Sequence, residues 1–216
     1  MTGLIIAPDF DHPDEKDSRE FQSQARMFIS ASGGMLCTFD NELPMTSRAS
    51  QVLADLDTIP PNSLAYVATC CHGWRRGIQF GFDTRGKESP QSNGVMGLAP
   101  HFLADAIAKV GKTDGSLVIP LYSCSTAEDP VNGFAATLSR LLTERGVPHA
   151  MFAHTNAGHC TRNPYVRTFG KRTGWLVEPG SAFWGLWVQS LHSPHDTLVY
   201  DYPFLDPAEL QTRLGA

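Results

Sequence analysis

The sequence predicts an α/β domain built on a mainly parallel sheet with helices on both of its faces. Short apolar runs alternate along the chain with longer segments of helical periodicity, which is the pattern of strand–helix–strand units. Several of these runs lack polar alternation, as parallel strands buried on both faces do. A chain of 216 residues is long enough for one such domain and short for two.

Five apolar runs have the length of buried strands. They lie at 4–7, 35–39, 64–71, 117–122 and 149–154. A further short strand is expected at 78–82. Pro120 falls inside the fourth run, and because proline cannot donate a hydrogen bond to a neighbouring strand, we expect a bulge at this residue.

Four segments between these runs carry apolar residues at helical spacing. They lie at 21–29, 49–56, 102–110 and 134–142. Asp17 and Glu20 form a capping-box pattern ahead of the first helix, and Ser47 is expected to begin the second. Glycines are expected to end three of these helices, at Gly33, Gly111 and Gly146.

The strand–helix pattern weakens after about residue 155. A stretch at 197–202 has the composition of an edge strand. No internal repeat or linker marks a second domain. We therefore expect a single domain over 1–216, with a core over about 3–154 and a C-terminal extension over about 155–216.

Composition narrows the class of partner. The net charge of −5 and the pI of about 5.9 provide no basic field to attract nucleic acid or an anionic membrane. No apolar run approaches the roughly 18 residues of a membrane span, and the first residues lack the basic start of a signal peptide. The five cysteines are scattered and odd in number, which favours free thiols. We expect a cytoplasmic protein without nucleic-acid or membrane partners.

Two of the predicted strands end in residues that can do chemistry. The third runs into His72 and Gly73, and the fourth into Cys124. The carboxyl ends of parallel strands meet at the edge of the sheet where sites form. If the two strands are neighbours, His72 lies beside the Cys124 thiol and can take its proton. The Gly73 N–H, which no side chain shields, can help to hold an oxyanion.

The segments 65–73 and 117–124 resemble those of the caspase-like superfamily of cysteine peptidases, which includes caspases, metacaspases, gingipains, legumains and separases. The shared pattern is an apolar strand ending in His-Gly and, some tens of residues later, an apolar strand ending in the catalytic Cys. The caspase His precedes its Cys by about 50 residues, and here 52 residues separate the two. The resemblance covers roughly residues 3–154.

The resemblance implies a caspase-like α/β/α sandwich and a cysteine endopeptidase. Such an enzyme hydrolyses peptide or isopeptide bonds of a peptide or protein substrate through a thioester acyl-enzyme, without a cofactor or a metal. By resemblance His72 is the general base and acid, Cys124 is the nucleophile, and the amides of Gly73 and Cys124 form the oxyanion hole.

The chain departs from the family next to the cysteine. Tyr122 stands where metacaspases carry an Asp that binds basic side chains, and Ser125 follows the cysteine where caspases have Arg. Acidic residues at this edge favour an Arg or Lys substrate unless they are only loop and cap residues, whereas arginines favour an acidic one. The candidates for substrate contact are Asp9, Asp11, Glu128, Asp129, His154, Asn156, Arg162 and Arg167.

Other functions compete with this interpretation. A zinc-dependent hydrolase would use His72, His154, His159 and a cysteine such as Cys71, although their spacing fits no zinc motif. A second possibility is a non-catalytic binding or regulatory module of the same fold. A third is a flavodoxin-like nucleotide or flavin binder, but 8–11 has the sequence Pro-Asp-Phe-Asp, which is a poor phosphate loop.

The C-terminal extension contains three tryptophans, Trp175, Trp184 and Trp187. They can form an apolar substrate subsite, but core packing or an oligomer contact is the commoner role of such residues.

Overall fold

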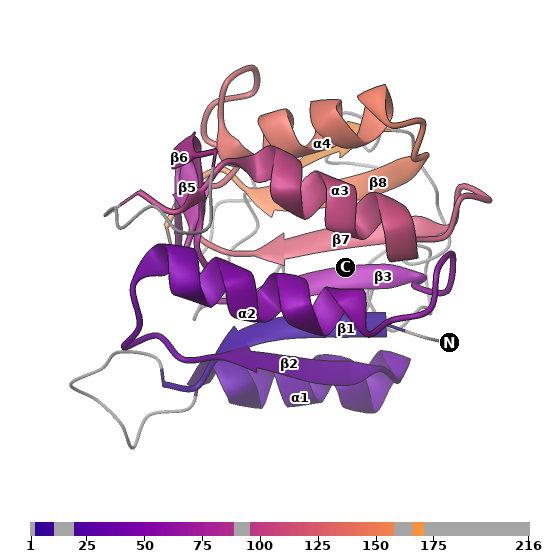
Figure 1. Ribbon diagram of the computed structural model, residues 1–216, viewed down its shortest axis with the longest axis horizontal. Helices are drawn as coiled ribbons and strands as arrows, with labels where there is room; N and C mark the ends of the chain where they lie inside the picture. Colours follow the sequence, from indigo (N-terminus) through magenta and orange to yellow (C-terminus); the bar gives the residue numbers. More distant parts are fainter. Residues whose placement is uncertain (1–2, 11–19, 89–95, 158–165, 171–216) are drawn as a thin grey trace, which may run out of the picture.

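The computed structural model of the chain describes residues 3–10, 20–88, 96–157 and 166–170. It contains a six-stranded sheet with the order β2-β1-β3-β7-β8-β9 and a three-stranded sheet with the order β4-β5-β6 (Figure 1). The larger sheet and its helices comprise β1 (Gly3–Pro8), α1 (Glu20–Ser32), β2 (Met35–Phe39), α2 (Met45–Asp57), β3 (Tyr66–Cys70), α3 (Pro100–Val110), β7 (Leu117–Tyr122), α4 (Phe134–Glu144), β8 (His149–His154) and β9 (Val166–Gly170). The smaller sheet comprises β4 (Gly73–Trp74), β5 (Gly77–Ile78) and β6 (Phe82–Lys87).

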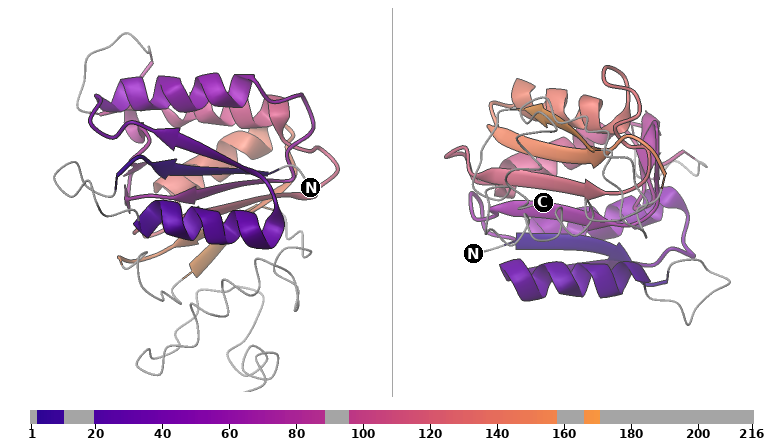
Figure 2. Two further views of the ribbon diagram at one scale, coloured as in Figure 1. Left: turned by 90° about the horizontal axis from the view of Figure 1, so that it is seen from below. Right: turned by 180° about the vertical axis from the view of Figure 1, so that it is seen from behind.

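The larger sheet is mainly parallel and lies between helices, as predicted. Strands β2, β1, β3, β7 and β8 pair in parallel, and β9 joins β8 in the antiparallel direction. Helix α1 lies on one face and α2 on the other (left view of Figure 2). The order of the five parallel strands is the doubly wound order in which ligands bind beyond the carboxyl ends of the strands.

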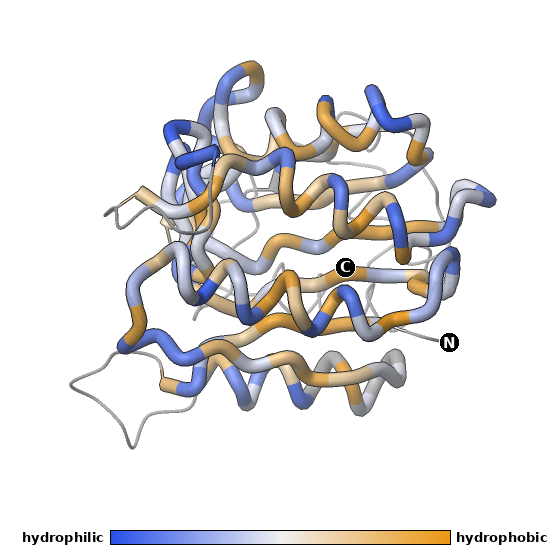
Figure 3. The backbone as a smooth tube through the Cα atoms, in the orientation of Figure 1, coloured by the Kyte–Doolittle hydropathy of each residue, from blue (hydrophilic) through white to orange (hydrophobic). Residues whose placement is uncertain are grey.

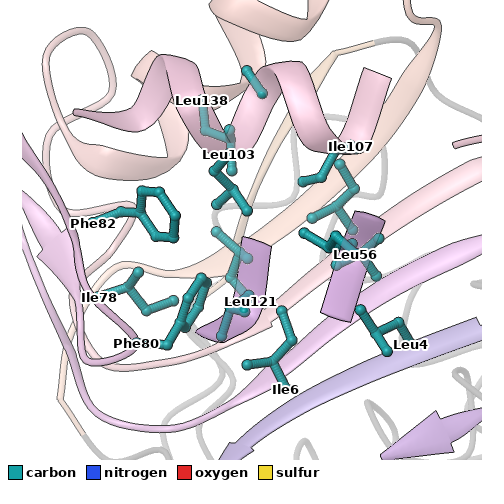
Figure 4. Close-up of a cluster of buried hydrophobic side chains, with 14 of the residues drawn as sticks. Leu4, Ile6, Leu56, Ile78, Phe80, Phe82, Leu103, Ile107, Leu121 and Leu138 are labelled. Carbon is teal, nitrogen blue, oxygen red and sulfur yellow. The ribbon is translucent and has the colours of Figure 1, made fainter. Parts of the chain in front are cut away.

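The main core lies between the sheet and helices α2, α3 and α4. Figure 4 shows the side chains from both layers that interdigitate there. They include Leu4, Ile6, Leu121, Leu56, Leu103, Ile107 and Leu138. Helices α2 and α3 alternate hydrophobic and hydrophilic residues along their length (Figure 3), so each buries one face. Truncating one of these leucines to alanine costs about 2–5 kcal/mol of stability.

The smaller sheet extends this core beyond the carboxyl edge of the larger one. Strands β5 and β6 stand near the end of the larger sheet toward which β7 points (Figure 1). Ile78, Phe80 and Phe82 belong to the core cluster, and the ring centroids of Phe80 and Phe82 are 5.5 Å apart. The single strand expected at 78–82 is therefore wrong, since 77–78 and 82–87 form two strands joined by a turn at Gly81 with φ of 106°.

Most predicted helix ends are confirmed. Gly33 ends α1 with φ of 71°, and the N–H of Gly111 bonds to the Ile107 carbonyl at the end of α3. Helix α2 begins two residues before Ser47, at Met45, and Pro44 precedes it, so the predicted start was late. The capping-box residue Asp17 lies outside the described residues.

The bulge expected at Pro120 is wrong. Strand β7 keeps a constant offset to β8 from Leu117 to Leu121. On the β3 side, Val118 donates to the Ala65 carbonyl, and a residue at position 120 would donate to the next carbonyl along, that of Val67. The proline leaves out this one bond without shifting the register, because no extra residue is inserted.

The other edge of the sheet was not foreseen. Strand β9 pairs with β8 along its whole length, whereas the edge strand expected at 197–202 lies outside the described residues. Within the part of the chain that the structure describes, no helix is both long and apolar enough to cross a membrane.

Candidate active site

Strands β3 and β7 are neighbours, and their register aligns the two residues singled out by the sequence. Each β3–β7 pair joins residues 52 positions apart, as Cys70 and Tyr122 are. The same separation holds for His72 and Cys124, each two residues beyond that pair. Past the strand ends, the Cys71 N–H still bonds to the Tyr122 carbonyl at 3.4 Å. The two side chains therefore leave the sheet at equivalent positions, and both are half-buried.

The backbone around His72 is held by the smaller sheet. The Gln79 N–H donates to the His72 carbonyl at 2.9 Å, and the His72 N–H donates to the Gln79 side-chain oxygen at 3.1 Å. The first of these bonds continues the β4–β5 ladder beyond the Gly73–Ile78 pair, and the Gln79 side chain takes the place of the second backbone acceptor. Because bonded and non-bonded pairs alternate in an antiparallel ladder, the next residue, Gly73, directs its N–H away from β5.

Gly73 packs against the turn that carries Cys124. A Cβ atom at Gly73 would lie 2.8 Å from the Cys124 carbonyl oxygen and 2.7 Å from a methyl carbon of Thr126. Such distances lie well inside van der Waals contact. The His-Gly segment and the cysteine turn are thus in direct contact, which only glycine permits at this position.

The His72 ring is oriented from the α1 side of the sheet. Phe21 of α1, which is fully buried, meets the imidazole edge to face with ring centroids 4.9 Å apart and an interplanar angle of 82°. This contact restricts rotation of the ring and sets its plane relative to the cysteine turn.

The turn after the cysteine is tightly bonded to the end of β8. Ser125 has a φ of 54°, an uncommon conformation for a residue other than glycine. Its N–H donates to the Asn156 carbonyl at 3.0 Å, and the Ala127 N–H donates to the His154 carbonyl at 2.9 Å. The strained residue follows Cys124 directly, and such conformations cluster at active sites.

His154 is a buried residue next to this turn. Its ring packs against Tyr122 in a T-shaped arrangement with centroids 5.1 Å apart. Asn156, the other predicted contact from this segment, supports the cysteine turn through its backbone carbonyl.

A small polar cluster lies below the site. The hydroxyl of Ser123 is 3.1 Å from that of Thr69 and 3.5 Å from the Cys71 sulfur. Burial raises the pKa of the Cys71 thiol to about 12. Cys71 is thus a neutral thiol of the core.

The acidic residues after the cysteine differ in role. Asp129 accepts hydrogen bonds from the Val131 and Asn132 amides and forms an ion pair with Arg75 at 2.6 Å. The Asn132 amide and Arg75 hold the pKa of this carboxyl well below its usual range. Asp129 thus caps its own loop and ties it to the β4–β5 turn, whereas Glu128 is exposed.

Two further predicted residues lie at this edge. Arg167 donates to the Ala127 carbonyl at 2.7 Å and so contacts the turn after the cysteine from β9. Asp9 follows β1 and is half-buried, and its carbonyl accepts a bond from the Gln22 side chain at 3.1 Å. Asp11 and Arg162 lie outside the described residues, as do His159, Cys160 and the three C-terminal tryptophans.

Two of the competing interpretations, the zinc site and the phosphate-binding loop, can be compared with the described residues. Over residues 3–10, 20–88, 96–157 and 166–170, no group of three or more His, Cys, Asp or Glu side chains is arranged to hold a metal. The loop after β1 uses its first amides internally, since Asp9 donates to the Phe39 carbonyl and Phe10 to the Asn41 side chain. A phosphate-binding loop instead presents such amides to the anion.

Three residues of the site escaped the sequence reasoning, namely Phe21, Gln79 and Trp74. Phe21 appeared only as an apolar helix position and Gln79 only as part of a possible strand. The signal that was available for Trp74 was its place two residues after His72, where side chains of an extended chain share a face.

A comparison of the sequence with protein-family models finds no match, and none is found among curated proteins.

Proposed function

We propose that the protein is a cysteine peptidase with a caspase-like α/β/α sandwich, in which Cys124 and His72 form the catalytic dyad. The observation that supports this proposal most directly is the register of β3 and β7, which aligns the two residues at the carboxyl edge of the sheet. The Cys124 thiol is half-buried, and nucleophilic attack on a carbonyl requires such a thiol to have a base within hydrogen-bond reach, the role proposed for His72.

The reaction follows from the chemistry of the two side chains. His72 accepts the proton of the Cys124 thiol, and the thiolate attacks the substrate carbonyl carbon to give a tetrahedral oxyanion. The carbon–nitrogen bond then breaks as the imidazolium of His72 gives its proton to the leaving amine. The resulting thioester is hydrolysed by water, with His72 accepting a proton from the water and returning it to the sulfur. Water is the only co-reactant consumed, and both side chains return to their starting protonation states.

The amides of Gly73 and Cys124 are the proposed oxyanion donors. The Gly73 N–H points away from β5, and the glycine contacts the Cys124 turn, so the two amides belong to touching segments. Losing one such donor typically lowers kcat by about 10²–10³-fold. The substrate is a peptide or protein, and the scissile bond is a peptide or isopeptide amide.

Mass-spectrometric labelling tests the dyad. Iodoacetamide and acyloxymethyl ketone peptides with Arg, Lys, Asp or Leu at P1 would be applied to the wild type and to Cys124→Ala and His72→Ala. His101→Ala is the matched control, because this histidine lies on α3 with its side chain 33% exposed. We expect modification of Cys124 that His72→Ala slows by at least about 100-fold and His101→Ala leaves unchanged.

The preferred ketone peptide would identify the P1 class. Equal alkylation of Cys124 in the wild type and His72→Ala would refute the dyad and favour the non-catalytic binding module or the zinc-dependent hydrolase.

A further inference from the structure

The β4–β5–β6 sheet presents two faces of different character. Cross-strand pairing places Gly73, Ile78 and Phe82 in one row, and Ile78 and Phe82 are buried in the core. The adjacent row contains Trp74, Gly77 and Asp83, which therefore lie on the opposite face.

His72 shares this second face with Trp74. One backbone bond, from the Gln79 N–H to the His72 carbonyl, follows the β4–β5 ladder at residue 72, and side chains two residues apart in an extended chain point the same way. The indole of Trp74 is thus the next side chain along from the imidazole of the proposed dyad. It is half-buried, so part of the ring remains accessible.

A buried carboxylate holds the Trp74 ring in place. The indole Nε1 donates to Asp83 at 2.9 Å, and Asp83 is only 1% exposed. Arg85 contributes its backbone N–H at 2.8 Å and its guanidinium at 3.0 Å to the same carboxylate. Burial alone would raise the pKa of Asp83, but the hydrogen bonds from Arg85 and Trp74 lower it, so the group stays charged.

The Gly77 backbone packs against the indole ring of Trp74. A Cβ atom at this position would lie 2.7 Å from two carbons of the indole, so the ring lies directly over the Gly77 backbone. A side chain held by a hydrogen bond to a buried carboxylate and by a close backbone contact loses little conformational entropy when a ligand binds against it.

We propose that Trp74 is the wall of a substrate subsite next to the dyad and takes an apolar side chain of the bound peptide. This inference rests on the proposed peptidase function and specifies which substrates it favours. A half-buried indole whose polar end is anchored is suited to packing against a Leu or Phe side chain. Arg85 and Asp83 act as positioning residues that hold the ring.

Selectivity measurements on the intact protein test this subsite. Inactivation rates would be compared for two acyloxymethyl ketone peptides that share the best P1 residue and carry either Leu or Gly at the adjacent position. Trp74→Ala, Trp74→Phe and Asp83→Asn would be measured beside the wild type. Phe102→Ala, a half-buried aromatic on α3, is the matched control.

We expect the wild type to prefer Leu over Gly by about 10- to 100-fold, which corresponds to burial of one Leu side chain. Trp74→Ala should reduce this ratio to within about threefold of unity, whereas Trp74→Phe and Phe102→Ala should preserve most of it. Asp83→Asn should give an intermediate ratio because the ring is less firmly held.

The small reagent iodoacetamide does not reach into a subsite and separates the two proposals. If His72-dependent alkylation of Cys124 is normal in Trp74→Ala while the Leu/Gly ratio stays at its wild-type value, the subsite is refuted and the peptidase function stands. If the wild type shows no His72-dependent alkylation, both are refuted. A uniform slowing of every reagent in Trp74→Ala, with the ratio intact, would make Trp74 structural and also refute the subsite.

Discussion

His72 and Cys124 each lie two residues beyond Cys70 and Tyr122, the last pair of the β3–β7 ladder, and they are 52 positions apart, which is the offset of every pair in that ladder. The alignment comes from backbone pairing in the centre of the sheet and not from the loops that carry the side chains. The parallel pairing of β3 and β7 therefore brings the two residues to the same level of the sheet edge, whatever contacts their side chains make.

Replacing Gly73 with alanine should disable the site with little change in fold. The added methyl group would lie 2.8 Å from the Cys124 carbonyl oxygen and force the cysteine turn away from His72. A misplacement of about 1 Å costs roughly 100-fold in rate, so Gly73→Ala should slow labelling of Cys124 by about that factor. The measurement is the alkylation rate together with the thermal midpoint.

Gly146→Ala is the control for this substitution. Gly146 ends α4 with φ of 70°, and a Cβ there meets nothing within 4 Å. Alanine should lower stability through backbone strain alone and leave Cys124 labelling unchanged. Equal labelling rates for Gly73→Ala and the wild type would mean that the two segments are not as close as described.

Cys124 should react with iodoacetamide in the native protein under conditions where Cys37 and Cys71 do not. Burial raises the pKa of both latter thiols, to about 12 for Cys71, and Asp55 raises that of Cys37 further by accepting its hydrogen bond. Only the thiolate is alkylated. Peptide mapping at pH 8, before and after unfolding in urea, checks this order, and native labelling of Cys71 would contradict it.

Removing the Asp129 carboxylate should loosen the loop after the nucleophile. Asp129→Ala should lower the thermal midpoint more than Arg75→Ala, because the aspartate also caps the Val131 and Asn132 amides. Cys124 labelling should slow in parallel. Asp105→Ala, which breaks a remote ion pair with Arg145, is the control and should leave labelling unchanged. Equal effects of Asp129→Ala and Arg75→Ala on the midpoint would show that the caps contribute nothing.

His149 should make stability fall as the pH drops. Its Nδ1 donates to the Val147 carbonyl and its Nε2 accepts from the Ser139 hydroxyl, so the folded protein holds it neutral, and burial lowers its pKa. Below about pH 6.5 the unfolded chain binds a proton at this residue that the folded chain does not. The free energy of unfolding should therefore decline, by at most about 1.4 kcal/mol per pH unit from this residue.

Urea unfolding between pH 5 and 8 of the wild type and His149→Gln isolates this contribution. The variant should be less stable at pH 8 and lose less stability on acidification, so the two curves should converge as the pH falls. Parallel curves would mean that His149 titrates alike in the folded and unfolded states.

Sequence reasoning located the strands of the sheet well. The runs 117–122 and 149–154 coincide with β7 and β8, which are buried along their whole length, and the run 35–39 coincides with the edge strand β2. Turn-forming residues precede each of the three runs. The strand ends alone placed His72 and Cys124 at one edge of the sheet, since parallel strands present their carboxyl ends there. The pairing of β3 with β7, on which their adjacency depended, is a finding of the structure.

Other features depended on tertiary contacts that no local pattern records. Strands of two residues, such as β4 and β5, are too short for periodicity to appear. The contact of Phe21 with His72 joins segments far apart in the chain. Asp129 carries the same charge as Glu128 next to it, and only the fold decides which of the two becomes a cap. Pro120 was expected to force a bulge because the prediction did not consider that a strand can forgo one bond on one side.

The hydrogen bond that Pro120 cannot donate leaves β7 with fewer backbone bonds to β3 than to β8. Strand β7 pairs continuously with β8 from Leu117 to Leu121. The cysteine turn is hydrogen-bonded to the same side through the Ser125 and Ala127 amides. The hydrogen bonding between β7 and β3 is interrupted at Pro120. His72 is hydrogen-bonded to the smaller sheet through Gln79. The Cys124 thiol is thus attached to the β7–β8 side of the sheet and the His72 imidazole to the β3 side. The spacing between the thiol and the imidazole therefore depends on the one strand pair of the parallel sheet that lacks a backbone bond at Pro120.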